Sequence, residues 1–174
     1  MKLPLVWSAT LAVLLSSTAP AAELPEVSVA FRDPASFTDA GPLARVDPAH
    51  DPALIVLKKH VEDLARRYLS PGESLQVEFL DIDLAGRFEP WRPNASEVRI
   101  MRDVTWPRMR LRYSLERDRQ VVASAEESLV DLNYLLSNAA YFSSDPLRFD
   151  KALLDKWFAR RFDERPSTPV AQSR

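Results

Sequence analysis

"RMRLRYSLERDRQVVASAEESLV", residues 108–130, is the stretch that decides the fold. Its first part alternates apolar with polar residues, which is the pattern of a strand with one face on a core. The polar run "ERDRQ" predicts a turn, and the residues up to Val130 return as the second strand of a hairpin. The inward positions are Met109, Leu111, Tyr113 and Leu115, and the outward positions are Arg108, Arg110 and Arg112. A strand pair with one apolar face needs a second layer to cover that face.

Two amphipathic helices are predicted to form this second layer. Asp51-Pro52 begins the first, because aspartate accepts hydrogen bonds at a helix N-terminus and proline fits the first turn. Pro71-Gly72 ends it. Its apolar stripe consists of Leu54, Leu57, Val61, Leu64, Ala65 and Tyr68. Asp145-Pro146 repeats the opening pattern, and one side of the last helix carries Phe149, Leu153, Leu154, Trp157, Phe158 and Phe162.

Two further strands are predicted before the hairpin. Residues 27–31 alternate as a half-buried strand does, whereas residues 74–86, "SLQVEFLDIDLAG", change phase in the middle. Either both faces of the second strand are covered, or a bulge near Phe79-Leu80 shifts its register. Gly86 then allows a sharp turn, and Val98 and Ile100 indicate another short extended piece.

This order of elements predicts a single two-layer α+β domain over residues 23–162. We expect a mainly antiparallel or mixed sheet of four or five strands, with the two helices packed on one face.

The ends of the chain predict an exported protein. Residues 1–22 combine Lys2, an apolar run too short to span a membrane and a small-residue cleavage site near Ala21 or Ala22, which is typical of a signal peptide. Residues 163–174 are polar and rich in proline, and we expect a disordered tail. The chain has no cysteine, which excludes disulfides, thiolate zinc sites and a lipid anchor on cysteine.

The mature chain carries little net charge. Removal of Lys2 with the signal peptide leaves 22 basic against 25 acidic residues, a net charge of −3. This balance gives no reason to expect nucleic-acid binding. No second long apolar run occurs, so no membrane span is expected.

The blocks "SVAFRDPASFTD", "LDIDLAGRFEPWR", "VRIMRDVTWPRMRLRY" and "DPLRFDKALLDKWFARRF", in this order, resemble the bacterial family called domain of unknown function 3016. The resemblance covers residues 27–162. It implies a small exported protein of Gram-negative bacteria, periplasmic or secreted. It implies no activity and no site residues, so the chemistry has to be argued from the side chains.

Local charge is the strongest functional signal. Residues 87–119 hold nine arginines and five carboxylates, so the segment carries +4. Arginine binds carboxylate or phosphate through paired hydrogen bonds and stacks on aromatic rings. We therefore predict a surface for an anionic envelope component or an acidic protein surface, formed by Trp91, Arg92, Arg99, Arg102, Trp106, Arg108, Arg110 and Arg112. In the structural alternative, the outward arginines pair across strands with Glu126 and Glu127.

Carboxylates offer a second hypothesis, centred on Asp81, Asp83 and Glu89. The segment does not match a calcium-binding loop of the EF-hand type, because Ala85 and Arg92 occupy two of the ligand positions of that motif. The same carboxylates could form the acid–base pair of a hydrolase if they met in a cleft. No G-x-S-x-G motif or glycine-rich phosphate loop occurs, and no metal or cofactor is expected. The sequence thus favours an exported, non-catalytic binding module over an envelope hydrolase.

Overall fold

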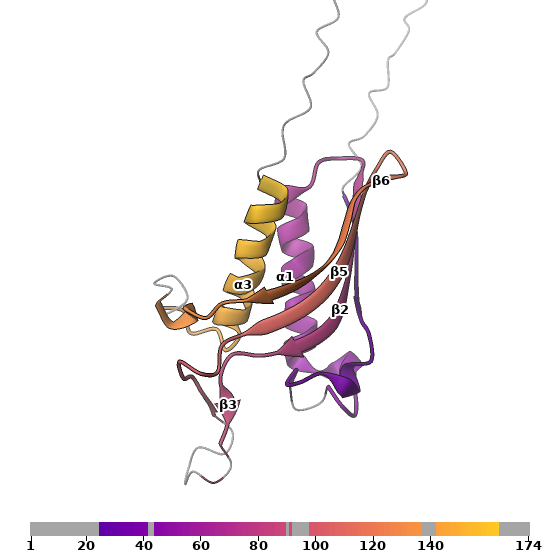
Figure 1. Cartoon of the computed structure of the whole chain (residues 1–174). Helices are drawn as coiled ribbons and strands as arrows, with labels where there is room; N and C mark the ends of the chain where they lie inside the picture. The colour runs from indigo at the N-terminus through magenta and orange to yellow at the C-terminus, as the bar shows by residue number, and fades with distance from the viewer. Residues whose placement is uncertain (1–24, 42–43, 90, 92–97, 137–141, 164–174) are drawn as a thin grey trace, which may run out of the picture.

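The computed structural model describes residues 25–41, 44–89, 91, 98–136 and 142–163. These residues form a four-stranded sheet of order β1-β2-β5-β6, a two-stranded β3–β4 ribbon, and two α-helices that cover one face of the larger sheet (Figure 1). The elements are β1 Glu26–Phe31, α1 Pro52–Tyr68, β2 Glu73–Asp83, β3 Arg87–Phe88, β4 Arg99–Ile100, β5 Arg108–Arg117, β6 Gln120–Val130 and α3 Arg148–Phe158. β1 runs parallel to β2, and the other neighbours are antiparallel. The predicted α+β fold with a mixed sheet is confirmed.

The β5–β6 hairpin forms as the alternation predicts. All four inward residues of β5 are buried, and Arg108, Arg110 and Arg112 face away from the helices. Asp118 and Arg119 take positive φ angles of 51° and 63° in the connecting turn. Two successive residues with positive φ are typical of the type I′ turn, whose twist matches that of a hairpin.

A β-bulge explains the phase change in β2. The pairing of β2 with β5 shifts between Phe79 and Asp81, which confirms the second of the two explanations. Before the bulge Leu75, Val77 and Phe79 face the core, and after it Ile82 does. Asp81 and Asp83 consequently share the helix-free face with Arg110 and Arg108.

The two helices begin differently. Asp51 caps α1 by accepting hydrogen bonds from the N–H groups of Ala53 (2.9 Å) and Leu54 (3.1 Å). α3 begins only at Arg148, with Leu147 as its N-cap, so the prediction that Asp145-Pro146 opens this helix was wrong by two residues. The Asp145 carboxylate instead accepts from the Leu147 N–H at 2.8 Å in the preceding turn.

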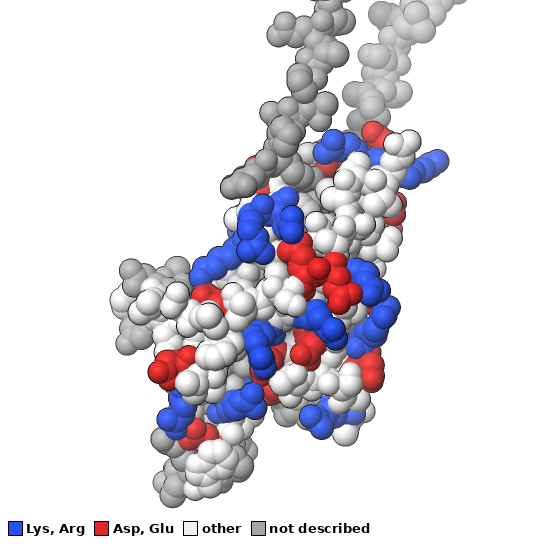
Figure 2. All heavy atoms as spheres, viewed as in Figure 1, with Lys and Arg blue, Asp and Glu red and all other residues white. Residues whose placement is uncertain are grey.

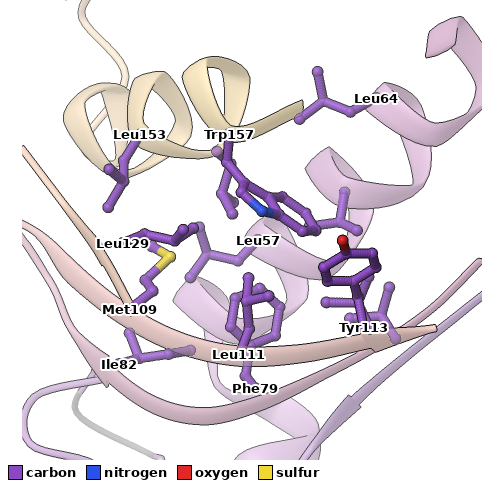
Figure 3. Close-up of a cluster of buried hydrophobic side chains, with 14 of the residues drawn as sticks. Leu57, Leu64, Phe79, Ile82, Met109, Leu111, Tyr113, Leu129, Leu153 and Trp157 are labelled. Atoms are coloured by element: carbon purple, nitrogen blue, oxygen red, sulfur yellow. The ribbon is translucent and has the colours of Figure 1, made fainter. Parts of the chain in front are cut away.

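The core lies between the sheet and the helices (Figure 3). Trp157 of α3 packs edge-on against Tyr113 of β5, with ring centroids 5.6 Å apart. A π-helical turn, Ala159–Asp163, continues α3 and buries Phe162 against the Trp157 ring. The aromatic side of the last helix therefore fills the core as its periodicity predicts.

Several predictions concern residues outside the described ranges. The signal peptide 1–22, residue Arg92 and the tail beyond Asp163 belong to them. Within the described ranges, no helix combines the length and the apolar character that a membrane span requires.

Candidate binding surface

The helix-free face of the four-stranded sheet, called the open face below, carries a groove of about 530 Å³. A row of small polar side chains crosses its floor from strand to strand. The register places Ser28 beside Gln76, Gln76 beside Ser114, and Ser114 beside Ser124. All four strands therefore contribute a hydroxyl or an amide to one line across the sheet, and such groups can both donate and accept hydrogen bonds.

A row of alternating charges lies beside this polar row. Glu78 binds Arg32 at 2.9 Å and Arg112 at 3.4 Å. Arg112 also binds Glu126 at 3.0 Å, and Arg110 lies 3.8 Å from the same carboxylate. Basic and acidic side chains are interspersed in the same way over the face seen in Figure 2. The arginines on this surface are thus matched by carboxylates of neighbouring strands.

Arg108 is held by a buried carboxylate at the end of β2. Its guanidinium lies 2.6 Å from Asp83, whose side chain is only 7% exposed, and Arg87 approaches the same carboxylate at 3.6 Å. These residues line a small cavity of about 80 Å³. Glu127 pairs instead with Arg160 and Arg161 after α3, so the predicted cross-strand pairing holds for Glu126 and not for Glu127.

Arg99 binds the end of β2 from the β3–β4 ribbon. Its side chain is 12% exposed and donates to both carboxylate oxygens of Asp39, at 3.3 and 2.9 Å. It also donates to the carbonyls of Leu84 (3.1 Å), Ala85 (3.0 Å) and Gly86 (2.7 Å). A guanidinium that satisfies three backbone carbonyls and one carboxylate has a structural role here.

Asp150 completes this junction from the first turn of α3. Its carboxylate is 1% exposed and accepts from the Ala85 N–H at 2.9 Å. Burial raises the pKa of Asp150 to about 6, while the Ala85 hydrogen bond and the nearby Arg99 charge act in the opposite direction. Asp39 and Asp150 were not predicted from the sequence, because no local pattern distinguishes them from aspartates on the surface.

Gly86 is required where the chain leaves β2. Its φ is +74°, and a Cβ at this position would lie 2.9 Å from the Ile100 carbonyl oxygen. The predicted sharp turn at Gly86 is confirmed.

The remaining candidates of the partner surface lie around the ribbon. Arg102 binds the buried Glu89 through two contacts of 3.0 and 2.7 Å. Trp106 is half-buried against a small apolar cluster that contains Tyr134. Trp91 is 74% exposed. The described members of the predicted surface thus divide between the open face (Arg108, Arg110, Arg112) and the ribbon region (Trp91, Arg99, Arg102, Trp106).

The three alternative carboxylates have separate partners. Asp81 accepts from the N–H of Thr38 at 2.8 Å and from its hydroxyl at 3.0 Å. Asp83 binds arginine at the end of β2, and Glu89 binds Arg102 beside the ribbon. Within the described residues, no three acidic or histidine side chains are grouped in a way that could hold a metal ion.

Together the fold and this surface define a class of α+β protein in which a mixed sheet, covered by helices on one side, exposes a grooved polar face on the other. The chain belongs to the family described as protein of unknown function (DUF3016), which it matches over residues 25–160. Neither the comparison with curated proteins nor that with solved structures gave a match.

Proposed function

We propose that this protein is exported to the bacterial envelope and acts there as a non-catalytic binding module, with the open face as its binding surface. The groove of about 530 Å³ on that face carries the proposal. It has the size of a ligand site, and polar side chains from every strand of the sheet line it. The signal peptide expected at residues 1–22 supports an envelope location.

The charge pattern narrows the chemistry of the partner. An anionic partner that binds Arg112 has to displace Glu78 or Glu126. The displaced carboxylate then keeps only its second arginine, Arg32 for Glu78 or Arg110 at 3.8 Å for Glu126. A neutral polar chain, such as an envelope glycan, can bind the hydroxyl and amide row while these ion pairs stay in place. We therefore favour an extended, hydrogen-bonding glycan as the partner over an acidic protein surface or lipid headgroups.

The hydrolase alternative has less support among the described residues. A carboxylate pair has to face substrate at a separation of about 5 to 10 Å, with one member protonated. Asp81, Asp83 and Glu89 each bind a neighbouring side chain, and none of them lines the large groove. The carboxyl with the raised pKa, Asp150, is buried under the end of β2.

Co-sedimentation with isolated peptidoglycan sacculi tests the proposal. Ser114→Trp fills the groove floor from a position that faces away from the helices, and Gln120→Trp is the matched control in β6 outside the groove lining. We expect the unchanged protein and the control to sediment with sacculi and Ser114→Trp to lose at least about tenfold in affinity, or ~1.4 kcal/mol. Equal sedimentation of all three proteins, or of none, would overturn the assignment of the open face to an envelope glycan.

Vesicles of phosphatidylglycerol provide the anionic comparison. Binding to vesicles but not to sacculi, lost in a protein with both Arg110→Gln and Arg112→Gln, would identify an anionic partner and refute the glycan. Arg108 is left unchanged in this variant because it pairs with the buried Asp83. Export is tested separately by N-terminal sequencing of the periplasmic protein, which should begin after Ala21 or Ala22. Recovery of the protein with its first 22 residues in the cytoplasm would contradict export.

A further inference from the structure

The two edge strands of the larger sheet, β1 and β6, are protected to different degrees. β6 carries Glu126 and Glu127, and arginines after α3 bind Glu127. Charged side chains on an edge hinder the addition of another strand. β1 reads EVSVAF and contains no lysine, no proline and no bulge. Glu26, at its first position, is its one charged residue, so from Val27 to Phe31 the strand lacks the features with which proteins commonly block an exposed edge.

The backbone of β1 presents hydrogen-bonding groups on its outer side. The Arg32 N–H donates to the Phe79 carbonyl at 2.9 Å, and in a parallel pair every second residue faces the partner strand. Counting back from Arg32, the outward N–H and C=O groups belong to Val27, Val29 and Phe31. Within the part of the chain that the structure describes, these groups have no backbone partner. They match the spacing of the donors and acceptors of one extended peptide.

An apolar groove of about 410 Å³ lies beside this edge, between β1 and α1. Its lining residues are Val29, Ala30, Phe31, Pro34, Pro48, Ala49, Leu54, Ile55 and Lys58. Ile55 lies outside the buried stripe of α1 and is 50% exposed. Since side chains alternate along a strand, a peptide paired with β1 would direct every second side chain into the groove.

Lys58 gives this groove a charge. It lies one helical turn after Ile55 and lines the groove, and no carboxylate of the described residues is within ion-pair distance of it. Its neighbour Lys59, by contrast, binds Asp63 at 3.3 Å. A partner with a carboxylate at this end of the groove would complement the charge of Lys58.

We infer that the β1 edge is a docking site for an extended segment of a partner polypeptide, which pairs with β1, places alternate apolar side chains in the groove and brings a carboxylate to Lys58. This site uses the outer edge of β1 and the helix side of the sheet. It does not depend on glycan binding at the open face.

Synthetic peptides of about six residues, the length that covers β1, test the inference. The probes alternate valine with threonine and carry either aspartate or lysine at one end. We expect the aspartate peptides to bind and to slow hydrogen exchange of the Val27, Val29 and Phe31 amides, measured by NMR. The lysine peptides should bind at least about tenfold more weakly.

Two variants and a control separate this site from other surfaces. Ile55→Gln and Lys58→Gln should each weaken the aspartate peptides by about fivefold or more, whereas Lys59→Gln removes the same charge one residue away and should leave affinity unchanged. The inference would be overturned if Ile55→Gln bound the peptides as tightly as the unchanged protein. It would also be overturned if peptide did not slow hydrogen exchange at the Val27, Val29 and Phe31 amides. Slow exchange already present without peptide and increasing with protein concentration would assign the edge to a second copy of the chain and refute a foreign partner.

Discussion

Replacement of Asp150 by asparagine should change how stability depends on pH. The Asp150 carboxyl is buried at the first turn of α3, and its pKa rises from an ordinary 3.8 to about 6 in the folded protein. The protonated form is therefore favoured by folding, and its contribution is fully present below pH 3.8 and lost as the pH rises through about 6. The pKa difference corresponds to a free energy of about 3 kcal/mol, at ~1.36 kcal/mol per unit.

Asparagine reproduces the protonated carboxyl in shape and remains uncharged at every pH. Its carbonyl oxygen can still accept from the Ala85 N–H, which Asp150 does at 2.9 Å. We expect the free energy of unfolding of Asp150→Asn, measured by urea titration from about pH 4 to about pH 7, to rise relative to the unchanged protein by up to ~3 kcal/mol. The other titrating groups are common to both proteins and largely cancel in this difference.

Asp145→Asn is a control with the opposite sign. Burial acts to raise the Asp145 pKa, but hydrogen bonds from Lys151 and the Leu147 N–H outweigh it, so the pKa is lowered. Its contribution to stability is present above the unfolded pKa and is lost as the pH falls. Asp145→Asn should thus become less stable than the unchanged protein as the pH rises. A difference for Asp150→Asn that stays constant with pH, or has the sign of the control, would refute the reasoning about Asp150.

The remaining predictions concern stability, measured by urea titration of each variant. Gly86→Ala should cost about 2 kcal/mol or more, because strain at positive φ adds to a clash with β4, whereas Gly72→Ala, with positive φ and open space, should cost only about 1 kcal/mol; equal losses would contradict the clash. Asp51→Ala should cost about 2 kcal/mol through loss of two N-cap hydrogen bonds, and a loss below about 0.5 kcal/mol would dismiss the cap. Arg108→Gln should cost about 1 to 3 kcal/mol because it weakens the pairing of a buried carboxylate, whereas Arg110→Gln, at an exposed pair, should change stability by less than about 1 kcal/mol; the reverse order would be inconsistent with this assignment.

Much of the fold could be predicted because local patterns and tertiary packing agree. The alternation in β5 places Met109 and Leu111 in the core, and the spacing from Leu54 to Leu64 fixes the buried side of α1. At β2 the pattern gave two alternatives. Only the pairing with β5 identified the bulge between Phe79 and Asp81, because a register exists only between two strands.

The candidate surface was less predictable. The arginine-rich segment suggested one basic site, but Arg99 binds Asp39, sixty positions earlier in the chain, and Arg112 binds Glu78 across the sheet. The net charge of a sequence segment does not include carboxylates that are distant in the chain but adjacent in the folded protein. Part of the polar row on the open face could be predicted from the sequence, since Gln76, Ser114 and Ser124 fall at outward positions of their strands.

The sequence by itself determined the α+β class, the two helices, the β5–β6 hairpin and the outward direction of Arg108, Arg110 and Arg112. Hydrophobic periodicity and turn residues carry this information within a few positions of one another. The tertiary structure alone decided that β1 pairs in parallel with β2 at an exposed edge, that Asp150 lies buried beneath Ala85, and that Asp39 and Glu78 pair with Arg99 and Arg112. Each of these depends on which distant segments meet, since burial, ion pairing and pKa are set by neighbours in space rather than in sequence.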